Sequence, residues 1–166
     1  MSLATLNPNG YPDARMVLLK DFDERGFTFY TNLNSVKGRS LKKAARAALV
    51  FYWEPLARQV RIQGKTEIVS GKEADAYWKS RPRLSQLGAW ASQQSDVLPH
   101  RDVLLKEVAR LARHYGAGPI PRPPYWTGVR VIPHHIEFWQ GRANRLHDRL
   151  LYTKAKNRWR IDRLYP

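Results

Sequence analysis

The sequence of 166 residues contains no cysteine, which excludes disulfide bonds and zinc sites built from thiolates. It also lacks an apolar run long enough to cross a membrane as a helix, and its first residues do not resemble a secretory signal. Acidic residues are scarce, because 14 Asp and Glu stand against 29 Lys and Arg. We therefore expect a cytoplasmic protein that does not enter membranes.

The formal charge of +15 favours anionic ligands. Nucleic acid, an acidic membrane surface and small phosphorylated molecules are the classes of partner that fit such a charge. The hydrophobic content of 43% is typical of a globular protein, and the length suits one domain. We expect residues 1–166 to form that single domain.

Short β-forming runs fill the first part of the chain, and turn signals at residues 7–10 and 23–26 separate some of them. In the run 14–20, expected to be a mostly buried strand, Arg15 and Lys20 lie on opposite faces. These two cations could face a ligand from two sides or simply extend to water. The pattern indicates a meander or a small barrel. The expected strands cover residues 3–6, 14–20, 27–31, 47–53, 58–62 and 66–69.

Helices are expected between and after these strands. Ser35 can cap a basic helix that runs to residue 45 and either binds a phosphate near Lys37 or is an ordinary surface helix. Ser70 and the Glu three positions later form a capping box, and the helix that follows places Tyr77 and Arg81 on one face. Further helices are expected at 85–92 and 102–115, before a proline-rich loop at 116–124.

The stretch 136–149 carries the strongest chemical signal. Residues 136–139 alternate as a strand, residues 141–144 form a turn, and alternation resumes at residue 145. On a strand, Arg145, His147 and Arg149 would share one face. Two guanidinium groups and an imidazole suit a planar anionic ligand, although a solvated edge strand with outward charges fits the pattern as well.

Residues 138–141 (Phe-Trp-Gln-Gly) and 145–149 (Arg-Leu-His-Asp-Arg) resemble the C-terminal signature of the pyridoxine/pyridoxamine phosphate oxidases, flavin enzymes of vitamin B6 metabolism. The chain end at 161–166 is also similar, although the family usually has a smaller residue where Tyr165 stands. Further blocks look like those of the family and follow in order at 15–20, 29–32, 58–60, 80–82, 85–90 and 94–95.

The resemblance implies a mainly β (α+β) fold, namely a split β-barrel with flanking helices that binds FMN at a homodimer interface. It implies that the substrate phosphate is held by Lys20, Tyr77, Arg81 and Ser85. It places Arg145, Leu146 and His147 at the substrate ring, with Arg145 and His147 as the catalytic residues. The implied FMN contacts are Arg15, Met16, Val17, Leu18, Leu19, Lys20, Tyr30, Thr31, Lys37, Gln59, Gln94, Ser95, Trp139 and Arg149.

The reaction implied by the resemblance oxidises pyridoxine 5'-phosphate or pyridoxamine 5'-phosphate to pyridoxal 5'-phosphate. FMN takes the hydride, and dioxygen reoxidises the flavin with release of hydrogen peroxide. Two departures from the family pattern stand out. Val36 occupies a position where the family commonly has Arg, so one contact to the flavin phosphate is expected to be missing. The family segment that precedes the position of Met1 is absent from this sequence, and part of that segment closes over the substrate.

Three other functions fit parts of the sequence. A related split-barrel flavoprotein, such as a flavin reductase or a pyridoxal-phosphate carrier, would bind FMN without this activity. A small barrel that binds nucleic acid would explain the charge, but the basic residues fall in discrete blocks and form no basic tail. A metal site of His134, His135 and His147 is disfavoured, because adjacent histidines on a strand point to opposite faces. No metal and no nucleic-acid partner are therefore expected.

Overall fold

The computed structural model describes residues 1–156 and 158–166. Its helices are α1 (Val36–Lys43), α2 (Gly71–Ser80), α3 (Arg83–Ala91) and α4 (Arg101–Tyr115), with short 3-10 turns η1 (Glu54–Leu56) and η2 (Ala143–Arg145). Along the described ranges, no helix is both long enough and apolar enough to cross a membrane. The strands are β1 (Ser2–Leu6), β2 (Pro12–Met16), β3 (Asp21–Asp23), β4 (Gly26–Asn32), β5 (Arg46–Trp53), β6 (Arg58–Ile68), β7 (Trp126–Gln140), β8 (Asp148–Ala155) and β9 (Arg158–Leu164).

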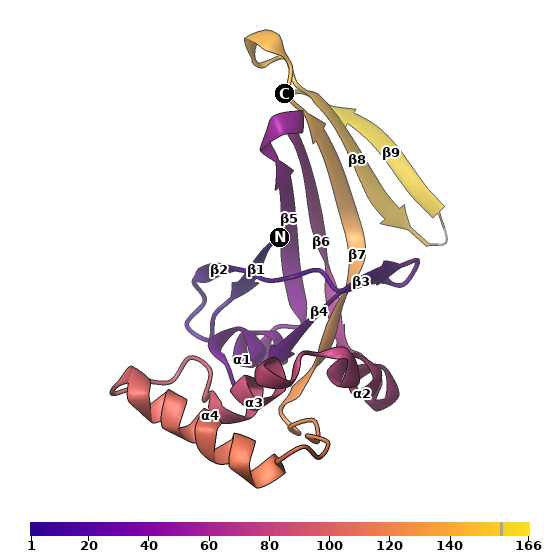
Figure 1. Cartoon of the computed structure of the whole chain (residues 1–166). Coiled ribbons are helices and arrows are strands. Elements are labelled where there is room, and N and C mark those ends of the chain that lie inside the picture. The colour runs from indigo at the N-terminus through magenta and orange to yellow at the C-terminus, as the bar shows by residue number, and fades with distance from the viewer. Residues whose placement is uncertain (157) are drawn as a thin grey trace.

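One antiparallel sheet organises the chain, in the order β2-β1-β5-β6-β7-β4-β3, with β8 and β9 added beside β7. Strand β7 serves two halves of the molecule, because residues 126–131 pair with β4 and residues 135–140 pair with β8. In Figure 1 the long strands β5, β6 and β7 form an arm, with β8 and β9 along its upper part and the helices gathered at its lower end. The predicted mainly β architecture with flanking helices is confirmed.

The two halves meet where β6 changes register with β7, between Gln63 and Gly64. The backbone of Gly64 approaches β7 so closely that an added Cβ would overlap the carbonyl oxygen of Ile132. A glycine is therefore required at this irregularity, and a side chain would push the strands apart.

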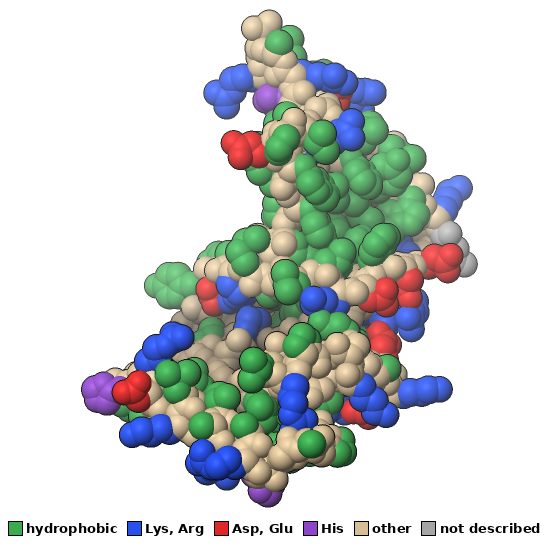
Figure 2. Space-filling view, in the orientation of Figure 1, with side chains coloured by type: hydrophobic (Ala, Val, Ile, Leu, Met, Phe, Trp, Pro, Cys, Tyr) green, Lys and Arg blue, Asp and Glu red, His purple; other side chains and the backbone are tan. Residues whose placement is uncertain are grey.

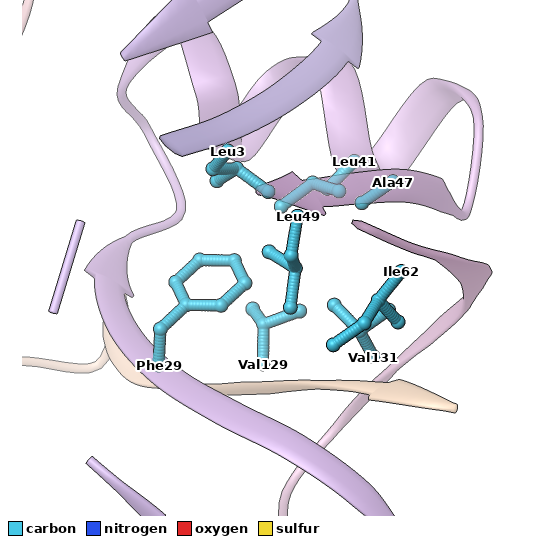
Figure 3. Close-up of a cluster of buried hydrophobic side chains, with 8 residues drawn as sticks. All are labelled: Leu3, Phe29, Leu41, Ala47, Leu49, Ile62, Val129 and Val131. Atoms are coloured by element: carbon cyan, nitrogen blue, oxygen red, sulfur yellow. The ribbon is translucent and has the colours of Figure 1, made fainter. Parts of the chain in front are cut away.

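A core of apolar side chains fills the lower, barrel-like half. In Figure 3 side chains from five strands and α1 converge on one another. Burial of each large side chain contributes about 1.5–3 kcal/mol relative to exposure. This core fixes the lower ends of β4, β5, β6 and β7. Its members are Leu3, Phe29, Leu41, Ala47, Leu49, Ile62, Val129 and Val131.

A smaller apolar cluster lies under the helices and attaches them to β7. Trp78 of α2, Leu87 of α3 and Leu111 of α4 pack with Trp126 of β7. The indole N–H of Trp78 donates to the carbonyl oxygen of Ile120 over 2.7 Å, which fastens the proline-rich loop to α2. This cluster holds α2 and α3 beside the ends of β4 and β7.

The sheet face that forms the core continues along the arm as exposed apolar surface. Phe51, Val60, Phe138 and Leu150 pair across neighbouring strands, so their side chains share one face. Ile161 belongs to the next row of the same face, and together these five residues define the apolar arm face. Figure 2 shows apolar side chains gathered over the upper half. Phe138 is 45% exposed and Ile161 is 54% exposed, which marks an interaction surface.

The helix starts predicted from the sequence are confirmed, since the hydroxyls of Ser35 and Ser70 accept hydrogen bonds within the first turns of α1 and α2. The buried strand predicted at 14–20 is wrong. Strand β2 ends at Met16, which is 74% exposed, and Leu18 is 68% exposed. The segment after Met16 crosses between two edges of the sheet, so it pairs only near its ends, where Lys20 N donates to Thr28 O over 2.9 Å.

Candidate active site

A cavity of about 670 Å³ lies between the crossing segment 16–20, the end of β4, the start of α1 and helices α2 and α3. It brings together all four predicted phosphate contacts and many of the predicted flavin contacts. Another hollow, of about 480 Å³ over β1, β5 and β6, contains none of the predicted site residues. The predicted residues that line the larger cavity are Met16, Val17, Leu18, Lys20, Tyr30, Thr31, Lys37, Tyr77, Arg81, Ser85 and Gln94.

The charged side chains in this lining are Lys20, Lys37 and Arg81, and no carboxylate stands among the lining residues. Burial, followed by the nearby Arg15 charge, lowers the pKa of the Lys37 ammonium. Burial likewise lowers the pKa of Arg81, whose Nε is buried without a hydrogen-bond partner in the described structure. Cations that have lost water in this way are stabilised by a bound anion. The cavity therefore fits a phosphate group.

An aromatic wall closes one side of the cavity. The ring of Tyr30 stacks on Tyr77 with centroids 3.9 Å apart and on Trp126 with centroids 5.2 Å apart. The Arg81 guanidinium lies 4.5 Å from the centre of the Trp126 ring. Burial raises the pKa of Tyr30 to about 12, so its hydroxyl remains protonated at neutral pH. Gly128 leaves room for the Tyr30 ring, because an added Cβ would stand 2.9 Å from that ring.

The start of α1 forms the opposite side. Lys37 Nζ donates to Gln94 Oε1 over 3.2 Å, and Val36 N donates to Ser95 Oγ over 3.3 Å. Gln94 and Ser95 thus lie against the first turn of α1, where backbone N–H groups favour anions. Arg15 does not line the cavity. Its guanidinium pairs with Asp13 and donates to Thr5 Oγ1 over 2.8 Å.

A second group of predicted residues lies on the arm, away from the cavity. Gln59 of β6, Trp139 of β7 and Arg149 of β8 are neighbours in register, on the face opposite the apolar arm face. Glu137 accepts from Arg149 Nε over 2.9 Å. The His147 ring lies 4.6 Å from the Trp139 ring. The two groups occupy different ends of the molecule in Figure 1.

The predicted strand face of Arg145, His147 and Arg149 is wrong, because β8 begins only at Asp148. Arg145 ends the 3-10 turn η2 with a φ of 62°, and Leu146 is 68% exposed. The loop is closed by Arg142, whose N–H donates to His147 Nδ1 over 3.1 Å, so His147 faces the loop. The left-handed backbone at Arg145 was not visible in the alternating sequence.

Sequence reasoning missed several residues that line the cavity or carry buried charge. Trp126 completes the aromatic wall, and Asn32 and Ser92 also line the cavity. Arg130 and Glu137 are buried charged residues inside strand β7. A charge in an otherwise apolar strand was the available signal for both, because buried charges need partners.

The order of strands, the shared strand β7 and the cavity beside α1 define the chain as a split β-barrel with flanking helices. The family model described as pyridoxamine 5'-phosphate oxidase matches residues 1–115. The model described as the pyridoxine 5'-phosphate oxidase C-terminal dimerisation region matches residues 126–166.

Two curated relatives carry the name pyridoxine/pyridoxamine 5'-phosphate oxidase. The relative from Nostoc punctiforme is 58% identical and that from Azorhizobium caulinodans 55% identical. Both matches cover 100% of this chain, with 78% and 79% of the respective relatives. The chain belongs to the pyridoxamine 5'-phosphate oxidase family, as its sequence motifs predicted.

Solved structures share the fold of this chain. PhzG from Burkholderia lata, in complex with tetrahydrophenazine-1-carboxylic acid, superimposes with a TM-score of 0.93 at 34% identity, covering 99% of this chain and 81% of PhzG. A pyridoxamine 5'-phosphate oxidase-related, FMN-binding protein from Nostoc punctiforme has a TM-score of 0.78 at 19% identity, covering 99% of this chain and 86% of that protein. The latter likeness supports the split-barrel fold alone.

Proposed function

We propose that this protein oxidises pyridoxine or pyridoxamine 5'-phosphate to pyridoxal 5'-phosphate, using FMN and dioxygen and releasing hydrogen peroxide. The observation that carries the proposal is the cavity with three cations, no lining carboxylate and an aromatic wall. Such a lining suits planar molecules that carry phosphate. The names of the curated relatives support the same substrates.

We propose that the working site needs two copies of the chain, which together form a homodimer of single-domain subunits over residues 1–166. The cavity residues and the group Gln59, Trp139 and Arg149 lie at different ends of one chain, so one copy does not bring them together. The apolar arm face offers a surface for a second copy, and a dimerisation region covers residues 126–166. Burial of this face would remove exposed Phe138 and Ile161 from water.

The proposed FMN contacts divide between the two groups. Lys37 would hold the FMN phosphate beside the start of α1, next to Gln94 and Ser95. Arg15 is a further proposed contact, and it would have to reach the phosphate from its pair with Asp13. Gln59, Trp139 and Arg149 would approach from the partner. FMN, when bound, would accept the hydride from the substrate carbon. The remaining proposed FMN contacts come from the segment 16–20. Of these, Met16, Val17, Leu18 and Lys20 line the cavity, and Leu19 lies between them in sequence.

The proposed substrate contacts begin with the phosphate. Arg81, Tyr77, Ser85 and Lys20 lie around the cavity and can donate to phosphate oxygens. Energy from this remote group can fix the reacting carbon in position. Arg145 would lie over the pyridine ring, and His147 would hydrogen-bond a ring substituent through Nε2, because Nδ1 accepts from Arg142. Leu146 adds apolar contact.

The test is reconstitution. The apo-protein is mixed with FMN, and the formation of pyridoxal 5'-phosphate and hydrogen peroxide is followed with each phosphorylated vitamer. We expect both products in equal amounts. FMN binding without product would favour a flavin reductase or a carrier of pyridoxal phosphate. Turnover of a reduced phenazine carboxylate in place of the vitamers would favour a PhzG-like function. The TM-score of 0.93 to PhzG is the observation that supports this second candidate.

A further inference from the structure

Arg130 is a buried cation that lies outside the cavity. It belongs to β7 and is 4% exposed. Its Nη1 donates to Glu67 Oε1 of β6 over 3.0 Å, and its Nη2 donates to Glu73 Oε1 of α2 over 2.6 Å. Burial by itself lowers the pKa of Arg130, but the hydrogen bonds that its guanidinium donates to the two carboxylates outweigh burial and raise the pKa. Arg130 therefore ties a helix to the sheet as a permanent cation.

The carboxylate of Glu73 binds a residue outside its own helix, although Glu73 stands at the capping-box position of α2. In the capping box, Ser70 Oγ accepts from Glu73 N over 3.2 Å, so the first half of that motif is present. The Glu73 side chain bonds to Arg130, whereas a complete box returns it to the backbone of the cap residue. The first turn of α2 is thus attached to β7 by a charged pair rather than closed on itself.

The same face of α2 leads into the cavity. Glu73, Tyr77 and Arg81 follow at intervals of four residues, so they form one row along the helix. The pair with Arg130 fixes the start of this row. Tyr77 reaches the cavity from the later part of α2, and Arg81 reaches it from the C-cap position directly after the helix.

The Arg81 guanidinium lies over the Trp126 ring but makes few hydrogen bonds. Its Nη2 donates to the carbonyl oxygen of Ser85 over 3.0 Å, and its Nε has no partner in the described structure. The position of this guanidinium therefore depends on where the end of α2 places the Arg81 side chain over the Trp126 ring of β7. A small rotation of α2 would displace Tyr77 and Arg81 together, because Tyr77 belongs to α2 and Arg81 is its C-cap residue, whose backbone N–H donates to the carbonyl oxygen of Trp78.

We propose that Arg130, acting through Glu73, is a positioning residue that sets the phosphate subsite formed by Tyr77 and Arg81. Arg130 does not line the cavity, so it acts by aligning α2. This inference rests on the proposed function, in which Tyr77 and Arg81 bind the substrate phosphate.

The decisive variant is Glu73→Ala, because a purely electrostatic role and an aligning role of Glu73 predict opposite effects on phosphate binding. Removal of a negative charge near a phosphate subsite strengthens phosphate binding if charge alone matters. Misalignment of α2 weakens it, since well-placed charge-assisted hydrogen bonds are lost. We expect the affinity for a phosphorylated ligand to fall roughly tenfold to a hundredfold, with the affinity for the same ligand without phosphate changed by less than about twofold. Arg130→Gln should act in the same direction.

The probes are 4'-deoxypyridoxine 5'-phosphate and 4'-deoxypyridoxine, titrated into the FMN-loaded protein. Both lack the hydroxyl or amine at C4' that the proposed reaction oxidises. The dissociation constant of the unphosphorylated probe divided by that of the phosphorylated probe measures how much the phosphate contributes to affinity. Partial unfolding would weaken the binding of both probes alike and leave this ratio unchanged. Glu67→Ala is the matched control, since it removes a carboxylate from the same guanidinium without touching α2. Its ratio should stay near that of the wild type. Should Glu73→Ala not fold, Glu73→Gln can replace it, because glutamine keeps the size of the side chain and one acceptor oxygen. We expect Glu73→Gln to reduce the preference for the phosphorylated probe, by a smaller factor than Glu73→Ala.

The outcomes separate the two proposals. If the wild type binds both probes equally, Tyr77 and Arg81 do not form a phosphate subsite, and the proposed function fails. If the wild type prefers the phosphorylated probe but folded Glu73 and Arg130 variants keep or increase that preference, the positioning role is refuted and the proposed function stands.

Discussion

Arg149 and Arg145 stand four residues apart, yet their structural settings predict different effects when each is replaced by Leu. Arg149 lies on β8, where its guanidinium donates to Glu137 over 2.9 Å and to the carbonyl oxygen of Tyr165 over 3.0 Å. Arg145 lies in an exposed loop turn before β8. We therefore expect Arg149→Leu to weaken FMN binding, and Arg145→Leu to leave FMN bound but impair substrate oxidation.

The magnitudes follow from the contacts that are lost. A hydrogen bond to a charged group contributes about 1.5–3 kcal/mol, so the FMN dissociation constant of Arg149→Leu should rise roughly tenfold to a hundredfold. Arg149→Leu also leaves the buried Glu137 carboxylate with Arg61, 3.3 Å away, as its remaining cation in the described structure. The free energy of unfolding should fall by about 1–3 kcal/mol. Arg145→Leu should lower kcat/KM by a similar tenfold to hundredfold factor, at about 1.4 kcal/mol per tenfold, without that loss of stability.

The assay combines flavin titration of the apo-protein, thermal unfolding and steady-state kinetics on each variant. Arg142→Leu is a suitable control, because Arg142 is a cation of the same loop. Its guanidinium pairs with the partly exposed Asp148. Its flavin affinity should match the wild type. Loss of FMN from Arg145→Leu, or unchanged turnover by that variant, would refute the division of roles between these two arginines.

Three further predictions concern the flavin site and assembly. Val36→Arg should tighten FMN binding about tenfold, because residue 36 is the first residue of α1 and lies beside Ser95. A flavin titration with no change in affinity would mean that this side chain does not reach the phosphate. Lys37 has a pKa below the ordinary 10.5, and only its charged form attracts phosphate, so FMN affinity should fall as pH rises through that lowered pKa. Lys37→Arg should flatten this decline when affinity is titrated against pH. Phe138→Glu on the apolar arm face should give a monomer by sedimentation that binds FMN poorly, and a monomer that retains FMN would contradict a shared site.

The sequence correctly predicted helix starts and turns, because these depend on interactions between residues that are close together in the sequence. Ser35 and Ser70 mark helix starts because their hydroxyls satisfy N–H groups a few residues away. The turn at residues 7–10 similarly depends on its own residues, with Gly10 at a φ of 86°. Failures occurred where distant segments decide the outcome. Strand β2 ends at Met16 because the next residues cross between sheet edges, and this crossing is not encoded in alternation.

The sequence by itself determined the family, the secondary structure near strong caps and turns, and an excess of cations suited to phosphate. Its motifs also named most residues of the cavity, because those motifs keep their order and spacing along the chain. Only the tertiary structure divided the predicted site into two groups, since strand pairing places Gln59, Trp139 and Arg149 together on the arm and leaves the cavity at the other end. It also paired Arg130 with Glu67 and Glu73, which lie 63 and 57 residues away in sequence, and the buried charge of Arg130 is tolerated only because the fold brings these carboxylates to it.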